Sequence, residues 1–482
     1  MNPQRLLIGL ALTLAACPKS SPTAAPEAAR VERPAPLPER PFKMPEVSSA
    51  TLSNGIRVQL APNHEVPLFE VRLLVNMGSW NDPEGKEGLY SVTLDLMDTA
   101  AGDRDSQQLA RTLNSLGGSV GAGGGLTRGS VSASGLVRNF EPILDVWADV
   151  LLRPSFPEDE WTLERSRRIA AVERRKDDPN AIANTVFDKL VYGNAYAGRE
   201  TSVASYNNIS LDDMKALHAE WIRPEHTTIL VAGDLDIDTV VAALEARLGS
   251  WTSKTPAETP RPEVAPADMT PTMYFVDKPG AAQSVVQTAI LVDGFLAEDR
   301  ADLMLANTAF GGAFTARVNM NLREDKGYTY GARCGIMYRH GPGIWYCSTS
   351  VSTPTTGPSL IEIRKELDEA RADRPITDEE IAFFKAFRVN AYPRQFETSG
   401  ALLGEWANMW THNLPDDWLE RYVPSIQAVE TSNANDAFRR WIDPSKMMYV
   451  VVGDGEVIRD DLEAFGLPVV ELDTTGAPVE TP

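Results

Sequence analysis

The sequence predicts an α+β protein built from two homologous domains. Its 482 residues are too many for one hydrophobic core and suit two domains of roughly 200 residues each. Part of the first half recurs in the second, because Trp-Ile-Arg-Pro at 221–224 returns as Trp-Ile-Asp-Pro at 441–444, 220 residues later. A proline-rich stretch at 255–272 separates the two halves. We therefore expect a duplicated domain with a linker between the copies.

Two further matches support the duplication. The run Thr-Ile-Leu-Val-Ala-Gly-Asp at 228–234 corresponds to Tyr-Val-Val-Val-Gly-Asp at 449–454, and Arg-Pro at 153–154 corresponds to Arg-Pro at 374–375. Three matches in the same order at displacements of 220 or 221 residues are not expected by chance. The expected boundaries are a signal at 1–17, a tether at 18–46, domains at 47–254 and 273–472, the linker at 255–272 and a tail at 473–482.

Each half mixes strand and helix patterns without a regular alternation, which indicates an α+β arrangement. Apolar patterns predict strands at 56–60 and 68–75, and two Val- and Ile-rich runs predict buried strands that end at Gly233 and Gly453. Helical periodicity predicts helices at 139–152, 157–175, 211–221 and 361–371.

A glycine-rich stretch at 117–125 holds six glycines in nine residues. It lacks the Lys-Ser/Thr pair of a phosphate-binding loop and a nucleotide-binding fold around it. We interpret it as a flexible turn between a helix and a strand.

The N-terminus has the pattern of an export signal. A basic residue precedes an apolar run at 6–14, which is too short to span a bilayer. The Leu-Ala-Ala-Cys ending at 14–17 looks like a bacterial lipobox, in which Cys17 takes a lipid; an ordinary signal with a chance cysteine is the alternative. The next stretch, 18–46, has eight prolines and predicts an extended tether. We expect a lipoprotein anchored in the cell envelope, and Pro18 favours the outer membrane, facing the periplasm.

The acidic composition limits the class of partner. The formal net charge is −21, and no basic face is evident in the sequence. Because phosphate binding needs a basic surface, we expect no nucleic-acid partner.

Two cysteines are placed to face each other across a hairpin. Cys334 and Cys347 flank His-Gly-Pro-Gly at 340–343, a strong turn signal, and lie about equally far from a turn centred near residues 340 and 341. Cross-strand neighbours are close enough for a disulfide, and an exported protein meets an oxidising compartment. The sequence therefore predicts a Cys334–Cys347 bridge.

Three segments carry a resemblance to a known family. They are Asn-Met-Gly-Ser-Trp-Asn-Asp-Pro at 76–83 with Gly-Leu at 88–89, Tyr-Gly-Asn-Ala-Tyr-Ala-Gly-Arg at 192–199 after Asp-Asp-Pro at 177–179, and Leu-Arg-Glu-Asp-Lys-Gly-Tyr-Thr-Tyr-Gly at 322–331 after Gly-Gly-Ala-Phe at 311–314. Together they resemble the insulinase (pitrilysin) family over about residues 48–472. The resemblance implies a duplicated metallohydrolase-like α+β roll that forms half of a clamshell.

Active proteins of that family bind zinc through a His-x-x-Glu-His helix and a distal Glu. Two imidazoles at i and i+4 hold the ion, and the carboxylate between them deprotonates its water. In this chain the corresponding positions are Ser91, Leu94 and Asp95, and counting places the distal position near Ala181. We therefore expect no zinc or other cofactor in this chain, which makes it a pseudoenzyme when alone.

The resemblance also implies a substrate-binding pair in the second half. Arg323 and Tyr330 match an Arg and a Tyr that, seven residues apart in active relatives, hold the substrate near the zinc. Both side chains are suitable donors to a peptide carbonyl and to its oxyanion. In the alternative, Arg323 caps a helix C-terminus and Tyr330 begins a strand, with no functional role.

Two functions remain open from the sequence. In the first, the chain forms a heterodimer with a zinc-bearing sibling subunit and lends Arg323 and Tyr330 to proteolysis of a peptide substrate. In the second, it is a catalytically inactive lipoprotein that binds peptides or serves as a scaffold. An independent hydrolase has little support, because no nucleophile motif stands out.

Overall fold

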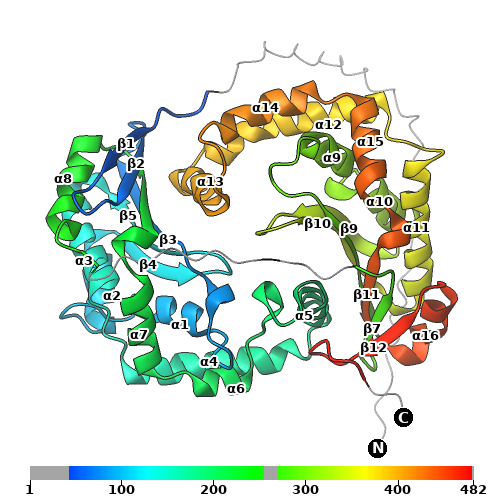
Figure 1. The fold of residues 1–482 in the computed structure, drawn as a ribbon, viewed down its shortest axis with the longest axis horizontal. Coiled ribbons are helices and arrows are strands. Elements are labelled where there is room, and N and C mark those ends of the chain that lie inside the picture. The colour runs from blue at the N-terminus through cyan, green and yellow to red at the C-terminus, as the bar shows by residue number, and fades with distance from the viewer. Residues whose placement is uncertain (1–42, 254–263, 265–268, 480–482) are drawn as a thin grey trace, which may run out of the picture. The chain divides into compact units, whose positions relative to one another are not determined.

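Two six-stranded sheets organise the part of the chain that the structure describes, which is residues 43–253, 264 and 269–479 of a computed structural model (Figure 1). The predicted signal with Cys17, most of the tether and most of the linker lie outside these residues. No helix of the described ranges is both long enough and apolar enough to span a membrane.

The two sheets are mixed, and each has the same core of strands. The first sheet, in spatial order, contains β1 (Ser48–Thr51), β2 (Arg57–Pro62), β6 (Thr227–Gly233), β3 (Leu68–Val75), β5 (Gly129–Leu136) and β4 (Ser119–Gly124). The second contains β12 (Val469–Leu472), β7 (Met273–Asp277), β11 (Met448–Gly453), β8 (Gln283–Val292), β10 (Gly343–Ser352) and β9 (Thr329–Met337). The two sheets differ only in the first edge strand. Strand β1 precedes the other strands of its sheet along the chain, whereas β12 follows the other strands of its sheet.

The helices follow the same plan in both halves. The first half contains α1 (Leu89–Met97), α2 (Ser106–Leu116), α3 (Phe140–Leu152), α4 (Glu158–Arg175), α5 (Pro179–Tyr192), α6 (Val203–Asn208), α7 (Leu211–Trp221) and α8 (Ile237–Leu248). The second half contains α9 (Arg300–Asn307), α10 (Arg317–Asn319), α11 (Thr356–Arg371), α12 (Asp378–Ala391), α13 (Ser399–His412), α14 (Trp418–Ala428), α15 (Thr431–Trp441) and α16 (Gly455–Ala464). The helices predicted from periodicity correspond to α3, α4, α7 and α11.

The predicted duplication is confirmed by the positions of equivalent elements. The strand order β2-β6-β3-β5-β4 of the first sheet matches β7-β11-β8-β10-β9 of the second. Three helix pairs, α4 with α12, α5 with α13 and α7 with α15, each begin 220 residues apart (158 and 378, 179 and 399, 211 and 431). The chain is therefore two homologous α+β domains, as the sequence predicts.

Each half contributes one helix to the sheet of the other half (Figure 1). Helix α5 packs Ile182, Ala183 and Val186 against β8 and β11 of the second sheet. Helix α13 packs Leu403 and Ala407 against β3 and β6 of the first sheet. Because α5 and α13 are equivalent in the duplication, the exchange is reciprocal and buries apolar surface from both halves.

The glycine-rich stretch differs from its prediction. Gly117 ends α2 with a left-handed φ of 58°, but Ser119–Gly124 form edge strand β4, not a turn. A Cβ on Gly124 would lie 2.6 Å from atoms of both Tyr90 and Leu94 of α1. The glycines therefore allow β4 to lie directly against α1, a requirement that local turn propensity does not reveal.

Candidate functional site

Helix α1, which carries the positions of the zinc motif, begins at a buried carboxylate. Asp82 accepts hydrogen bonds from the backbone N–H groups of Gly88 at 2.7 Å and Tyr90 at 2.8 Å. A carboxylate satisfies free N–H groups at a helix N-terminus and interacts favourably with its dipole. Burial raises the pKa of Asp82 to about 6, although these hydrogen bonds lower it. The Asp of the family-like segment therefore positions α1.

The first and second family-like segments contact each other. Arg199 donates to the backbone carbonyl of Asp82 and forms an ion pair with Glu87 at 2.8 Å. Gly78 lies so close to the backbone of Leu126 that a Cβ would overlap it. These contacts give both segments a structural role in this chain that does not depend on zinc ligands.

The motif positions on α1 have separate roles. Leu94 is fully buried and fills the core. Ser91 and Asp95 lie one turn apart, and the Ser91 hydroxyl donates to Asp95 at 3.4 Å. Arg168 of α4 forms an ion pair with Asp95, and its Nη1 lies 3.5 Å from Ser91 Oγ. Its Nε donates to Glu164 at 2.6 Å.

The residues at these positions do not fit a zinc ion. Zinc takes imidazole, thiolate and carboxylate ligands, whereas α1 offers a hydroxyl, an alkyl chain and one carboxylate that is already paired with a guanidinium. Within the described ranges, no group of three or more His, Cys, Asp or Glu side chains is placed to hold a metal.

Ala181, the position obtained by counting for the distal Glu of the zinc motif, does not lie in the helix that contacts Ser91 and Asp95. Ala181 lies in the first turn of α5, where its N–H is bonded by the side chain of Asp178, and α5 packs on the second sheet. The side chain that reaches Ser91 and Asp95 belongs to α4. Counting along the chain did not reveal this contact, because α4 lies against α1 in the first half whereas the next helix, α5, packs on the second sheet.

Arg323 and Tyr330 are brought together at an exposed surface of the second half. Arg323 lies in a helical segment, Met320–Asp325, and donates from Nη1 to the backbone carbonyl of Tyr330 at 3.0 Å. Its guanidinium stacks over Phe314, 4.7 Å from the ring centroid. The Tyr330 side chain, on β9, is 88% exposed and that of Phe314 is 54% exposed.

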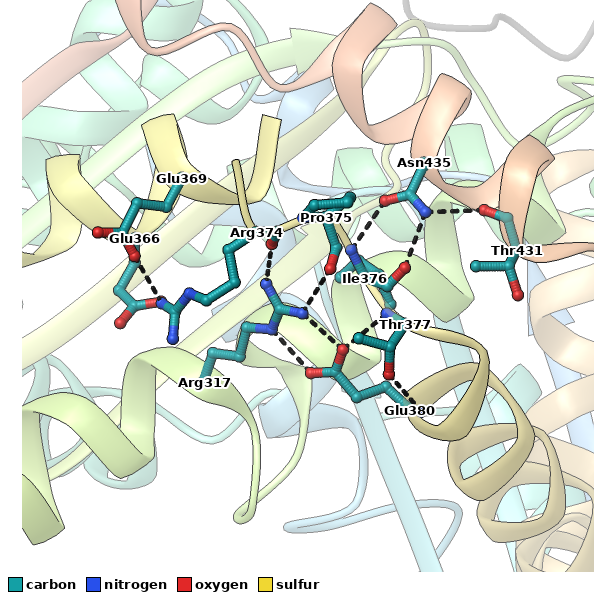
Figure 2. A network of polar contacts seen from close by, with 10 residues as sticks. All are labelled: Arg317, Glu366, Glu369, Arg374, Pro375, Ile376, Thr377, Glu380, Thr431 and Asn435. Atoms are coloured by element: carbon teal, nitrogen blue, oxygen red, sulfur yellow. Dashed lines mark hydrogen bonds and ion pairs between the residues drawn. The ribbon is translucent and has the colours of Figure 1, made fainter. Parts of the chain in front are cut away.

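A network of hydrogen bonds and ion pairs fixes the segment that precedes Arg323 (Figure 2). Arg317 of α10 forms an ion pair with Glu380 at 2.5 Å and donates to the backbone carbonyls of Arg374 and Pro375. Glu380 also accepts from the N–H of Thr377 at 2.8 Å. Arg317 therefore ties α10 to the start of α12.

A second set of contacts fixes the segment itself to α11. The Asn321 amide donates to Glu366 at 2.8 Å and to Glu362 at 3.0 Å. Lys326 pairs with Glu362 at 3.1 Å, and Arg374 pairs with Glu366. Arg323 is thus displayed from a firmly held segment, which is a requirement for a positioned donor.

The sequence alone did not reveal the residues that support the Arg323 segment or the residue that contacts Ser91 and Asp95. The capping box of α12 is visible in the sequence at 377–380, but the bond from Glu380 to Arg317 is not. The Glu164–Arg168 pair has the i, i+4 spacing of a helix, but nothing local indicates that Arg168 reaches Asp95. No hydrogen bond or ion pair between described residues joins Arg323 or Tyr330 to Ser91 or Asp95.

The two hairpin cysteines lie directly opposite each other. Cys334 of β9 pairs in register with Cys347 of β10, and the structure joins their sulfur atoms. Both are buried in the core of the second half, and a Cβ on Gly311 would overlap the Cys334 side chain.

Comparisons with known proteins agree with this geometry. Residues 57–204 match the family described as insulinase (peptidase family M16), and residues 208–386 match the peptidase M16 inactive domain. An uncharacterized zinc protease, YmxG of Bacillus subtilis, is 24% identical over 291 residues, which are 58% of this chain and 68% of that protein.

Solved structures show the same fold. A peptidase M16 inactive domain from Pseudomonas fluorescens has a TM-score of 0.75 at 24% identity and covers 85% of this chain and 98% of that chain. The periplasmic protease PqqL from Escherichia coli has a TM-score of 0.73 at 15% identity, covering 88% of this chain but 49% of that chain. On the shared signature segments, the shared fold and the matches over both halves, this chain belongs to the insulinase family, peptidase family M16.

Proposed function

We propose that this chain is the non-zinc partner subunit of an insulinase-family peptidase. Arg323 and Tyr330 contribute to the peptide-binding chamber of a zinc-bearing sibling, where the guanidinium and the phenol donate hydrogen bonds to a substrate carbonyl and to the oxyanion that forms on attack. The metal and the attacking water belong to the sibling. The chain alone therefore has no peptidase activity.

The observation that carries the proposal is the exposure of Tyr330. Tyr330 is 88% exposed on β9, and its backbone carbonyl accepts a hydrogen bond from Arg323, whose own segment is held by the contacts of Asn321 to Glu366 and Glu362. An aromatic side chain contributes little to folding when it is left in water, whereas exposed aromatic and Arg residues are enriched where proteins bind partners. This arrangement favours a binding role over a folding role for the Tyr330 ring.

The size of PqqL supports a paired arrangement. This chain covers about half of that protein, 49%, at a TM-score of 0.73. One polypeptide therefore holds a second region of comparable length beside a unit with this fold. The described residues form one such unit in which the zinc ligands are missing, and this supports a role beside a second unit that carries them.

A second candidate function is a catalytically inactive lipoprotein that binds peptides or serves as a scaffold. It is favoured by the contacts that Arg323 makes within its own chain, because the guanidinium donates to the Tyr330 carbonyl and stacks on Phe314. In that case Arg323 stabilises the start of β9 and contacts no substrate.

The test is turnover of a fluorogenic peptide by the reconstituted complex of this chain with a zinc-bearing sibling. Tyr330→Phe removes one hydroxyl, and we expect it to lower the rate by about 10²–10³, the usual loss for one oxyanion donor. Zinc content and complex yield should not change. Tyr328→Phe, in the same segment but packed against the core, is the matched control and should keep full activity.

Arg323→Ala tests the second donor of the pair. Its control is Arg439→Ala, since the Arg439 side chain is 42% exposed and that of Arg323 is 38% exposed. We expect only the Arg323 variant to lose activity without losing assembly. Full activity of both the Tyr330 and the Arg323 variants would leave the scaffold function as the better account.

We propose that the complex of the two subunits lies in the cell envelope. The lipobox-like ending at Cys17 and the proline-rich stretch after it support a lipid-anchored protein facing the periplasm. A lipid anchor would keep the complex and its peptide substrate at one membrane.

A further inference from the structure

The side chain of Arg168 reaches two positions of the zinc motif, Ser91 and Asp95. Arg168 crosses from α4 to α1, pairs with Asp95 and lies 3.5 Å from Ser91 Oγ, while Glu164 holds its Nε at 2.6 Å. The side chains of Arg168, Asp95 and Glu164 are 29%, 31% and 21% exposed, so the group is partly buried.

Ser91 and Asp95 occupy positions i and i+4 of one helix. Side chains with this spacing point to the same side of the helix, which is why two histidines placed there can hold one metal ion between them. In this chain the cation that contacts both positions is a guanidinium. An Arg side chain keeps its charge at every pH that a folded protein survives.

We propose that Arg168 occupies, as a cation, the place between Ser91 and Asp95 that a metal ion would take, so that zinc is excluded by occupation as well as by the missing ligands. The guanidinium is held here by the carboxylates of both Asp95 and Glu164. A divalent ion at the same place would lie within a few ångströms of a fixed positive charge and be repelled by it.

An ordinary helix–helix ion pair is the competing explanation. In that case Arg168 stabilises the packing of α1 on α4 but has no effect on whether a metal binds once ligands are present. The two explanations differ in one measurable quantity, which is the zinc affinity of a chain with restored histidines.

The experiment restores the two histidines and varies Arg168. Ser91→His with Asp95→His creates an i, i+4 histidine pair, and Leu94 is left unchanged because a carboxylate at this fully buried position would disrupt the core. Zinc affinity is measured by competition with a fluorescent chelator in three full-length chains, which keep Arg168 or carry Arg168→Gln or Arg168→Lys.

We expect the Arg168→Gln chain to bind zinc at least tenfold more tightly than the chain with Arg168. The Arg168→Lys chain should keep a low zinc affinity, because lysine keeps the positive charge. Arg167→Gln is the control, since Arg167 is the preceding residue of α4 and its side chain is 67% exposed, with a long 3.7 Å contact to Glu164. It should leave zinc affinity unchanged.

Equal zinc affinity with and without the Arg168 charge would overturn the proposal. Circular dichroism and thermal unfolding establish that each chain is folded. If the double-histidine chain does not fold, the same comparison is made with Ser91→His alone, where the introduced imidazole and the native carboxylate of Asp95 form the two-ligand pair.

Discussion

Arg339 and Asp188 form an ion pair across the two halves of the protein, with Nη1 and Oδ1 2.7 Å apart. Asp188 lies in α5, the helix that the first half contributes to the second sheet, and Arg339 follows β9. The Arg339 guanidinium also stacks on Tyr192, 5.3 Å from the ring centroid. The exchanged helix is therefore held by charge as well as by apolar packing.

Removing Arg339 should destabilise the protein. Arg339→Ala leaves Asp188, whose side chain is 25% exposed, without its partner, and burial already raises the pKa of Asp188. We expect the free energy of unfolding in urea to fall by about 1–3 kcal/mol. The control Arg364→Ala breaks a pair with Asp368 within α11, whose side chains are 35% and 56% exposed, and should cost no more than about 1 kcal/mol. An equal loss in both variants would contradict a special role for the Arg339 pair.

The carboxyl group of Asp82 should make stability depend on pH. Its pKa rises from 3.8 to about 6 on folding because of burial, so the native state binds the proton more tightly than the unfolded state. Its contribution to stability is complete below pH 3.8 and is lost as pH rises to about 6. The difference in unfolding free energy between the native chain and Asp82→Asn should therefore fall by about 2 kcal/mol from pH 4 to pH 7. A difference that stays constant over this range would show that Asp82 titrates normally.

The hairpin cysteines Cys334 and Cys347 should have no free thiol. Thiol titration of the denatured, unreduced chain over residues 43–482 should find none, and reduction should release two, from Cys334 and Cys347. Cys334→Ala with Cys347→Ala should lower the free energy of unfolding by about 2–4 kcal/mol, since the bridge restricts the unfolded chain. Two free thiols before reduction would rule out the bridge.

Cys17→Ser should release the protein from membranes. The cysteine ends the lipobox-like Leu-Ala-Ala-Cys sequence, and a lipidated N-terminus would be the attachment. We expect cell fractionation to recover the Cys17→Ser variant in the soluble periplasmic fraction. Unchanged recovery with membranes would show that the attachment lies elsewhere.

Local patterns in the sequence were sufficient for the plan of the fold. The 220-residue displacement of Trp-Ile-Arg-Pro predicted the duplication, and the helices α3, α4, α7 and α11 follow from residue periodicity and acidic helix starts. The departure of Ser91, Leu94 and Asp95 from the zinc motif is also visible in the sequence alone. These features depend on neighbours a few residues apart or on direct repetition, which the linear sequence records.

Other features depend on residues that only the folded chain brings together. The glycines of β4 are needed because Tyr90 and Leu94 lie against that strand, and local propensity suggested a turn. Arg168 meets Asp95 because α4 packs beside α1, whereas Ala181 follows α5 to the other sheet. The exchange of α5 and α13 was equally hidden, since an apolar helix face has the same sequence pattern whichever sheet it covers. Periodicity determines that a face is buried, and the tertiary packing of distant segments decides against what it is buried.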